Sequence, residues 1–288
     1  MKKLESAIDL SDLAATSLVT LYCRETESQS NNPILEDKVA VEITQRLNPV
    51  LSTSSVRLYR SLASGKLNKN LSLHIALRAR KYDEYTLEFL HRNPQAKIVN
   101  LGCGMDTRYF RINHPNALFF DLDMPEVIQV KREYIKELDN YVMIPCSLLD
   151  YRWMDQVLQA GRNPSLFLAE GVFMYLEVGE VKGFVLELQS RFPGSELVCE
   201  VVNSRWLSKF LKPLVHRKMQ RGAGRGKEAV FRSGISHGRE METWNKGIHF
   251  IDEWSYFDSN HPKLGWLRFL RKSELFRKTQ WTVHYHLN

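Results

Sequence analysis

The chain has 288 residues, of which 43% are hydrophobic, and its formal net charge at pH 7 is +7. This length and apolar content suit one large α/β domain, so we expect a single domain over residues 1–288. No segment reaches the roughly 20 uncharged apolar residues of a membrane helix, and the amino terminus has no apolar signal-peptide core. We therefore expect a cytoplasmic protein with no membrane partner.

The cysteines and histidines show no pattern typical of a metal or redox site. The four cysteines are widely spaced and form no C-x-x-C pair, which favours buried, reduced thiols. The nine histidines form no recognisable ligand set with nearby carboxylates or cysteines, so we expect no metal site. The positive net charge suits an anionic substrate as well as a nucleic acid, and it does not decide between them.

The first two regions of the chain differ in the spacing of their apolar residues. In residues 1–95 these residues recur at helical intervals, which predicts a helical N-terminal cap. Between residues 96 and 202, short apolar runs alternate with amphipathic segments, as in βαβ units. The runs are KIVNLGCG (97–104), ALFFDLD (117–123), YVMIPCS (141–147), SLFLAEGVF (165–173) and ELVCEVV (196–202). They predict a parallel sheet with helices on both faces, which would be the cofactor-binding core.

Two helices are predicted between these runs. The first begins at Pro125, which suits the first helical position, and it places Val127 and Val130 on one face. The second runs from about Glu177 to Arg191 and has its own apolar stripe. Right-handed crossovers between the parallel strands then fix much of the topology.

The last two regions are a basic stretch and a closing strand. We interpret residues 203–250 as a basic helical insertion or lid, because no acidic residue occurs between Val201 and Lys227. A solvated helix, a lid that attracts an anionic substrate and an RNA-binding surface remain open for it. Its aromatic residues are sparse, with Trp206 and Phe210 available to stack bases, which disfavours a nucleic-acid partner. Residues 251–288 end in the alternating WTVHYHL, which predicts the end of the sheet.

The segment IVNLGCGMDTR is the candidate cofactor loop. It places Gly102 and Gly104 at the end of the first predicted parallel strand, where ligands of open α/β sheets bind. A dinucleotide-binding loop would have a third glycine at position 107, which is threonine here. The next run ends in FFDLD, so Asp121 and Asp123 follow about 20 residues later, where a carboxylate can accept hydrogen bonds from ribose hydroxyls.

Three motifs together resemble the leucine carboxyl methyltransferase family, including the related tetracenomycin-type polyketide O-methyltransferases. They are IVNLGCGMDTRYFR, FFDLDMPEVIQVKR and LAEGVFMYL, and they occur in this order within residues 78 to about 190. The resemblance implies an α/β, Rossmann-like class I methyltransferase fold. Its sheet would have seven mostly parallel strands with one antiparallel member near the end, and N-terminal helices would cover the active site. The implied cofactor is S-adenosyl-L-methionine.

The resemblance also assigns roles to residues of this chain. It places Gly102, in the loop that includes Gly104, against the methionyl part of the cofactor. It assigns Asp123 to the ribose, and Glu170 to the border of the cofactor near its amino group. Arg78, in LRARKYD, matches the arginine that pairs with the methionyl carboxylate.

Other positions are alternatives to the family pattern or departures from it. Arg80 and Lys38 are alternatives for the role of the arginine. The resemblance places Ser147 and Leu148 against the adenine. The family often has Asp-Leu at these positions, so the hydroxyl of Ser147 replaces a carboxylate. Leu149 stands where leucine carboxyl methyltransferases tend to have a basic residue near the substrate carboxylate. This departure weakens the case for a protein carboxyl terminus as the substrate.

Each of these residues also has a simpler structural interpretation. Arg78 could be a solvated helix arginine, and Asp123 could open the helix that follows it. Glu170 interrupts an apolar strand, and a buried carboxylate without a partner is costly, so we expect a ligand or a cation beside it. Tyr175 is a candidate for the substrate wall, with core packing as the alternative. No residue is assigned a catalytic role.

The function that we predict is an S-adenosylmethionine-dependent O-methyltransferase. Its acceptor would be a carboxylate or hydroxyl of a small, natural-product-like molecule, and the basic charge suits an anionic one. A protein C-terminal carboxyl methyltransferase and a non-catalytic S-adenosylmethionine-binding protein are the alternatives. A carboxylate acceptor is already ionised at neutral pH, whereas a phenol needs a base or a cationic stabiliser. The sequence predicts neither the acceptor's identity nor the oligomeric state.

Overall fold

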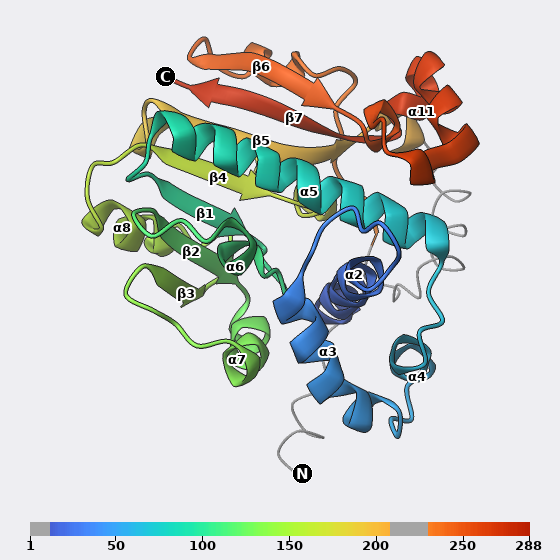
Figure 1. Cartoon of the computed structure of the whole chain (residues 1–288). Coiled ribbons are helices and arrows are strands. Elements are labelled where there is room, and N and C mark those ends of the chain that lie inside the picture. The colour runs from blue at the N-terminus through green and yellow to red at the C-terminus, as the bar shows by residue number, and fades with distance from the viewer. Residues whose placement is uncertain (1–11, 208–229) are drawn as a thin grey trace.

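Seven strands form one sheet in the order β3-β2-β1-β4-β5-β7-β6 (Figure 1). The computed structural model describes residues 12–207 and 230–288. The strands are β1 (Lys97–Leu101), β2 (Leu118–Asp123), β3 (Tyr141–Pro145), β4 (Ser165–Ala169), β5 (Ser195–Val202), β6 (Ile248–Trp254) and β7 (Gln280–Leu287). Strands β1 to β5 pair in parallel, and β7 is antiparallel to both of its neighbours. The seven-stranded sheet with one antiparallel member is confirmed.

Helices cover both faces of the sheet because the central strands are apolar on both sides. Every residue of β1, β4 and β5 is buried, as in parallel sheets that are covered on each face. The α-helices between β1 and β5 are α6 (Arg108–Ile112), α7 (Pro125–Tyr134), α8 (Arg152–Gln159) and α9 (Val178–Arg191). One core includes residues of α7, and the core on the other face includes α8 and α9. Both helices predicted within this region are present.

Within residues 12–96, which the structure describes, four helices precede the sheet, and they confirm the N-terminal helical cap. They are α2 (Asp12–Ser28), α3 (Lys38–Leu51), α4 (Arg57–Ala63) and α5 (Lys69–Arg92). The long helix α5 runs along one face of the sheet, and α2 and α3 lie near the carboxyl ends of the parallel strands (Figure 1). Helix α5 begins at Asn68, whose side chain accepts hydrogen bonds from the N–H groups of Asn70 and Leu71. The cap is therefore placed over the edge at which ligands bind.

The structure describes only part of the region predicted as a basic insertion. Most of the acid-free stretch, including Phe210, lies outside the described residues. The described parts contain two short 3₁₀ turns, η2 (Ser204–Leu207) and η3 (Glu240–Thr243), and the helical insertion itself stays a prediction. Strand β6 already begins at Ile248, inside the range assigned to the insertion, because its backbone pairs with β7.

Short helical elements connect β6 to β7. They are η4 (Tyr256–Asp258), η5 (Pro262–Lys272) and α11 (Glu274–Arg277). Leu264, Leu267 and Leu270 of η5 pack in a hydrophobic cluster that includes Leu73 and Leu77 of α5. None of the described helices has the length and apolar composition of a bilayer span.

Candidate active site

A cavity of about 260 Å³ lies at the carboxyl ends of the parallel strands, between the cap and the sheet. Eight of the residues that the sequence singled out line it: Arg78, Gly102, Gly104, Asp123, Ser147, Leu148, Glu170 and Tyr175. Leu149 lines it as well. Arg80 instead pairs with Glu84 on the exposed side of α5, and Lys38 is exposed and does not line the cavity. Of the cationic candidates, the structure thus brings Arg78 to the site.

The glycine loop after β1 requires glycine for two reasons. Gly102 and Gly104 have φ angles of 62° and 50°, in the left-handed region that favours glycine. A Cβ atom on Gly102 would also lie 2.6 Å from Cγ2 of Val172, and one on Gly104 would lie 2.8 Å from Cβ of Ser17. The loop therefore packs tightly between the end of β4 and helix α2, and it forms a narrow cradle for a ligand.

The two aspartates of β2 lie in different environments. Asp123 lines the cavity, and its carboxylate accepts hydrogen bonds from the N–H groups of Gly104 (2.6 Å) and Met124 (2.7 Å). Burial nevertheless raises the pKa of Asp123 above its ordinary value. Asp121 is buried and contacts Nζ of Lys131 at 2.5 Å and Oη of Tyr141 at 2.6 Å. Asp121 is thus a core residue, and Asp123 is the carboxylate that faces the cavity.

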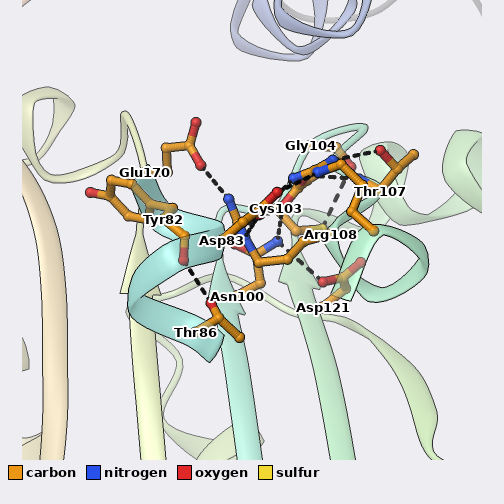
Figure 2. A network of polar contacts seen from close by, with 12 residues as sticks. Tyr82, Asp83, Thr86, Asn100, Cys103, Gly104, Thr107, Arg108, Asp121 and Glu170 are labelled. Carbon is orange, nitrogen blue, oxygen red and sulfur yellow. Dashed lines mark hydrogen bonds and ion pairs between the residues drawn. The ribbon is translucent and has the colours of Figure 1, made fainter. Parts of the chain in front are cut away.

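Glu170 is partly buried, and it has the cationic neighbours that the sequence analysis expected beside it. Its Oε1 accepts a hydrogen bond from Nε of Arg78 at 2.8 Å. Its Oε2 accepts one from Nη2 of Arg108 at 2.7 Å, a contact that Figure 2 shows. Arg78 also donates to Oε2 of Glu200 at 2.7 Å. Burial opposes the charge of Arg78, but Glu200 and Glu170 hold its pKa above the ordinary value. Arg78 is therefore a buried and paired arginine, not a solvated one.

A buried ionic network, which the sequence did not reveal, surrounds this pair. Arg108 contacts Asp83 of α5 at 2.9 Å (Figure 2). It also contacts Asp106 of the glycine loop at 2.6 Å. Arg111 contacts Asp83 at 2.7 Å and Asp37, just before α3, at 2.9 Å. The network joins the cap, the glycine loop and α6 through hydrogen-bonded ions. The close spacing of Asp106, Arg108 and Arg111 was a signal in the sequence, but it did not identify their distant partners.

The wall of the cavity away from the glycine loop is largely apolar. Val19, Leu71, Ile75, Met174 and Leu176 contribute to it. Such a wall suits a small ligand with a large apolar body.

Two polar residues stand within this wall. Tyr175 lines the cavity and also packs against Phe231, with ring centroids 5.8 Å apart, so both interpretations of this residue apply. The amide of Gln280, at the start of β7, donates a hydrogen bond to Oε1 of Glu200 at 2.7 Å. The wall therefore contains oriented polar groups among its apolar ones.

Three histidines, His74, His249 and His261, could accept a proton from a phenol, but they do not line the cavity. His74 lies behind the wall, with Nε2 at 3.7 Å from Oε1 of Glu200, and its ring packs on Tyr256. His249 and His261 lie elsewhere. Within residues 12–207 and 230–288, no cluster of three metal-ligating side chains is found.

Comparison with known proteins identifies the family. The model of the family described as leucine carboxyl methyltransferase matches residues 17–186. The chain belongs to this family. This methyltransferase is 29% identical over 253 residues to the tetracenomycin polyketide synthesis O-methyltransferase TcmP of Streptomyces glaucescens, covering 88% of this chain and 86% of TcmP. It is 28% identical to the S-adenosyl-L-methionine-dependent methyltransferase dpfgK of Gibberella zeae, covering 84% and 82% of the two chains.

The fold of the methyltransferase also matches a solved structure. A DUF574 family protein from Streptomyces avermitilis superposes with a TM-score of 0.58 at 10% identity, covering 84% of this chain and 96% of the other. This likeness concerns the fold alone. Family membership and the two relatives establish the activity class: the chain is a methyltransferase, and S-adenosyl-L-methionine is its cofactor.

Proposed function

We propose that the chain is an O-methyltransferase that methylates a carboxylate or hydroxyl of a small-molecule acceptor. The similarity to TcmP carries this proposal, because its 253 aligned residues extend beyond the region that the family model matches. The similarity therefore includes C-terminal parts of the chain as well as the cofactor core. The largely apolar far wall supports an acceptor with an apolar body.

The residues around the glycine loop fit S-adenosylmethionine. The cradle at Gly102 and Gly104 admits close approach of a ligand to the backbone, and we assign it to the methionyl part. Asp123 would accept hydrogen bonds from the ribose, because each carboxylate oxygen retains an acceptor site beside its backbone partner. Ser147 and Leu148, on the same cavity, would border the adenine.

The polar groups at the other end of the cradle suit the charged end of the methionyl group. Arg78 donates one N–H to Glu170 and one to Glu200, so its other N–H groups can donate to the carboxylate of the methionyl group. We assign Arg78 to the methionyl carboxylate, and Glu170 to the border of the amino group. These assignments remain part of the proposal.

The chain's contribution to the reaction is positioning and exclusion of water. When bound, S-adenosylmethionine supplies an electrophilic methyl group on a sulfonium sulfur. The acceptor oxygen would be held in line with the methyl group, and shielded from water, by helices α2 and α5 and the apolar wall. Such positioning corresponds to an effective molarity of about 10⁵ M or more. The titratable residues of the described wall are carboxylates, arginines, a cysteine and a tyrosine. A carboxylate acceptor suits this wall, since it is ionised at neutral pH without help.

Turnover with methyl-labelled S-adenosylmethionine tests the proposal. The panel should contain aromatic carboxylates, phenols, RNA and a peptide that ends in leucine. We expect label on oxygen of a small carboxylate or phenol. Label on the peptide alone would support the protein-methylating alternative instead, although Leu149 stands at the cavity where that activity would favour a basic residue. Tight cofactor binding without any turnover would favour the non-catalytic alternative.

A further inference from the structure

The segment between β6 and β7 exposes four large apolar side chains. Trp266 is 70% exposed, Phe269 56%, Phe276 48% and Leu275 41%. They belong to η5 and α11, which pack against each other and project at one end of the molecule (Figure 1). Exposed apolar residues are ordinary when they are scattered, but a group of them on adjacent elements marks an interaction surface.

The 3₁₀ geometry of η5 makes this segment amphipathic. In a 3₁₀-helix, side chains three residues apart lie on the same side. Leu267 and Leu270 are such a pair, and they pack inward towards α5. Trp266 and Phe269 form a second pair, which faces solvent. The inward leucines therefore anchor the segment, and the aromatic side chains are not needed for its packing.

Cations without an acidic partner surround the aromatic pair. Arg268, Arg271 and Lys272 are exposed, and within the described part of the chain none of them forms an ion pair. The guanidinium of Arg268 lies 5.3 Å from the ring centroid of Phe269, and Nζ of Lys272 lies 5.8 Å from it. The positive charge thus lies directly beside the exposed rings.

Neighbouring cations of the same segment are neutralised. Lys263 pairs with Glu27. Arg277 contacts Asp258 at 2.8 Å, and Lys278 contacts Glu253 at 2.8 Å. The unpaired charge is therefore confined to the part of the segment that carries the exposed aromatic residues.

We propose that this η5–α11 surface, made by Trp266, Phe269, Leu275 and Phe276 with Arg268, Arg271 and Lys272, binds the surface of an anionic lipid bilayer. Exposed aromatic and leucine side chains insert at the boundary between headgroups and acyl chains, and adjacent cations attract anionic lipids. Such binding needs no spanning helix. It departs from the sequence-based expectation that the chain has no membrane partner, and it goes beyond the proposed methyl transfer.

The charges favour a bilayer over other occupants. A second copy on the same surface would bring Arg268, Arg271 and Lys272 against their own equivalents, and like charges repel. A nucleic acid would use the cations and the rings, but Leu275 offers no face for stacking a base. An anionic bilayer uses the cations, the aromatic rings and the aliphatic side chains together.

Co-sedimentation of the full chain with vesicles tests the proposal. The vesicles are phosphatidylcholine alone or phosphatidylcholine with about a third phosphatidylglycerol. We expect binding to the anionic vesicles, little binding to the neutral ones, and weaker binding as salt rises. The tryptophan emission should shift to the blue on binding. Trp266→Phe should lose most of this shift while it still binds.

Two double variants separate the contributions of charge and apolar area. Arg268→Gln with Arg271→Gln should lower the partition coefficient roughly tenfold or more, and Trp266→Ala with Phe269→Ala should lower it several-fold. Matched controls are the exposed pair Arg57→Gln with Arg162→Gln, and Leu87→Ala, which is 49% exposed on α5. The controls should bind as the parent chain does, and all variants should keep its melting temperature.

Three results would overturn the proposal. The first is absence of binding to the anionic vesicles by a chain that binds S-adenosylhomocysteine normally. The second is vesicle binding that the control variants weaken as much as the two double variants do. The third is that the two double variants lose binding to RNA, or lose self-association in sedimentation, while they still bind the vesicles. None of these results bears on the methyl acceptor, so the proposed function is tested independently.

Discussion

Asp121 and Asp123 lie two residues apart on β2, but one carboxylate belongs to the core and the other faces the cavity. Asp121 pairs with the buried ammonium group of Lys131. Asp123 lines the cavity and accepts a hydrogen bond from the N–H of Gly104. Substituting the first should therefore affect folding, and substituting the second should affect ligand binding.

We expect Asp123→Ala to weaken S-adenosylhomocysteine binding by about 1.5–3 kcal/mol for each ribose hydrogen bond lost. Asp121→Ala should leave the charge of Lys131 buried and unpaired, which lowers the free energy of unfolding by about 3–5 kcal/mol. Calorimetric titration and urea denaturation of both variants measure these effects. If Asp121→Ala weakens binding more than Asp123→Ala does in folded protein, our assignment of the ribose carboxylate is wrong.

The pH dependence of the methyl-transfer rate distinguishes a carboxylate acceptor from a phenol. A carboxylate is fully ionised above about pH 5.5, so its single-turnover rate should stay level between about pH 6 and 9. A phenol should instead react faster as pH rises through the pKa of the group that removes its proton. Single-turnover rates with the acceptor found in the panel distinguish the two. A tenfold rise per pH unit over this range would exclude the carboxylate.

Helix α6 is the element that connects the cap to the glycine loop. Its Arg108 and Arg111 reach Asp83 of α5, Asp37 before α3 and Asp106 of the loop. A helix of five residues has little stability of its own, so these charged contacts fix its position. Loss of one partner leaves the others buried without compensation.

Arg111→Gln should therefore lower the free energy of unfolding by about 3–5 kcal/mol. Arg152→Gln is the matched control, because Arg152 forms its ion pair with Asp150 on the surface, with a side chain 85% exposed. An exposed pair contributes less than about 1 kcal/mol. Denaturation in urea compares the two variants. Equal losses would mean that the buried network contributes no more than a surface pair.

Elements with local signals were predicted from the sequence, and those with distant partners were not. The strands, the helix at Pro125 and the glycine loop follow from apolar runs and turn residues that lie side by side in the chain. The partners of Arg78 and Arg111 could not be found in this way, because Glu200 and Asp37 are 122 and 74 residues away. Strand β6 was missed for a similar reason. Its polar, partly exposed residues become a strand by pairing with β7.

The whole molecule holds several ionised carboxylates in low-polarity surroundings. Burial alone would raise the pKa of Glu196, but hydrogen bonds from His284 and Arg92 lower it to about 2 from an ordinary 4.5. Asp37 and Glu200 are also buried, and nearby arginines lower the pKa of each. A carboxyl whose pKa is lower in the folded state stabilises the fold at pH values above its unfolded pKa.

This stability should be lost as pH falls, because protonation then favours the unfolded chain. For Glu196 the loss should begin near pH 4.5 and continue to about pH 2. Urea denaturation at a series of pH values measures it, with Glu196→Gln as the comparison. The variant should be less stable than the parent at pH 7 and less sensitive to pH in this window. A parent whose stability is constant from pH 5 to about 2.5 would contradict the linkage.

The contacts that hold α2 over the glycine loop lead to a prediction about ligand exchange. Ser17 of α2 lies against Gly104, while Arg24 ties the helix to Asp37 and to the carbonyl of Met105. A ligand cannot pass through this wall until those contacts break. We therefore expect the association rate of S-adenosylhomocysteine to level off at high ligand concentration in stopped-flow measurements, because opening of the helix then becomes the slow step. If this opening is also slower than methyl transfer, release of S-adenosylhomocysteine limits turnover, and variants that loosen α2 should then turn over faster.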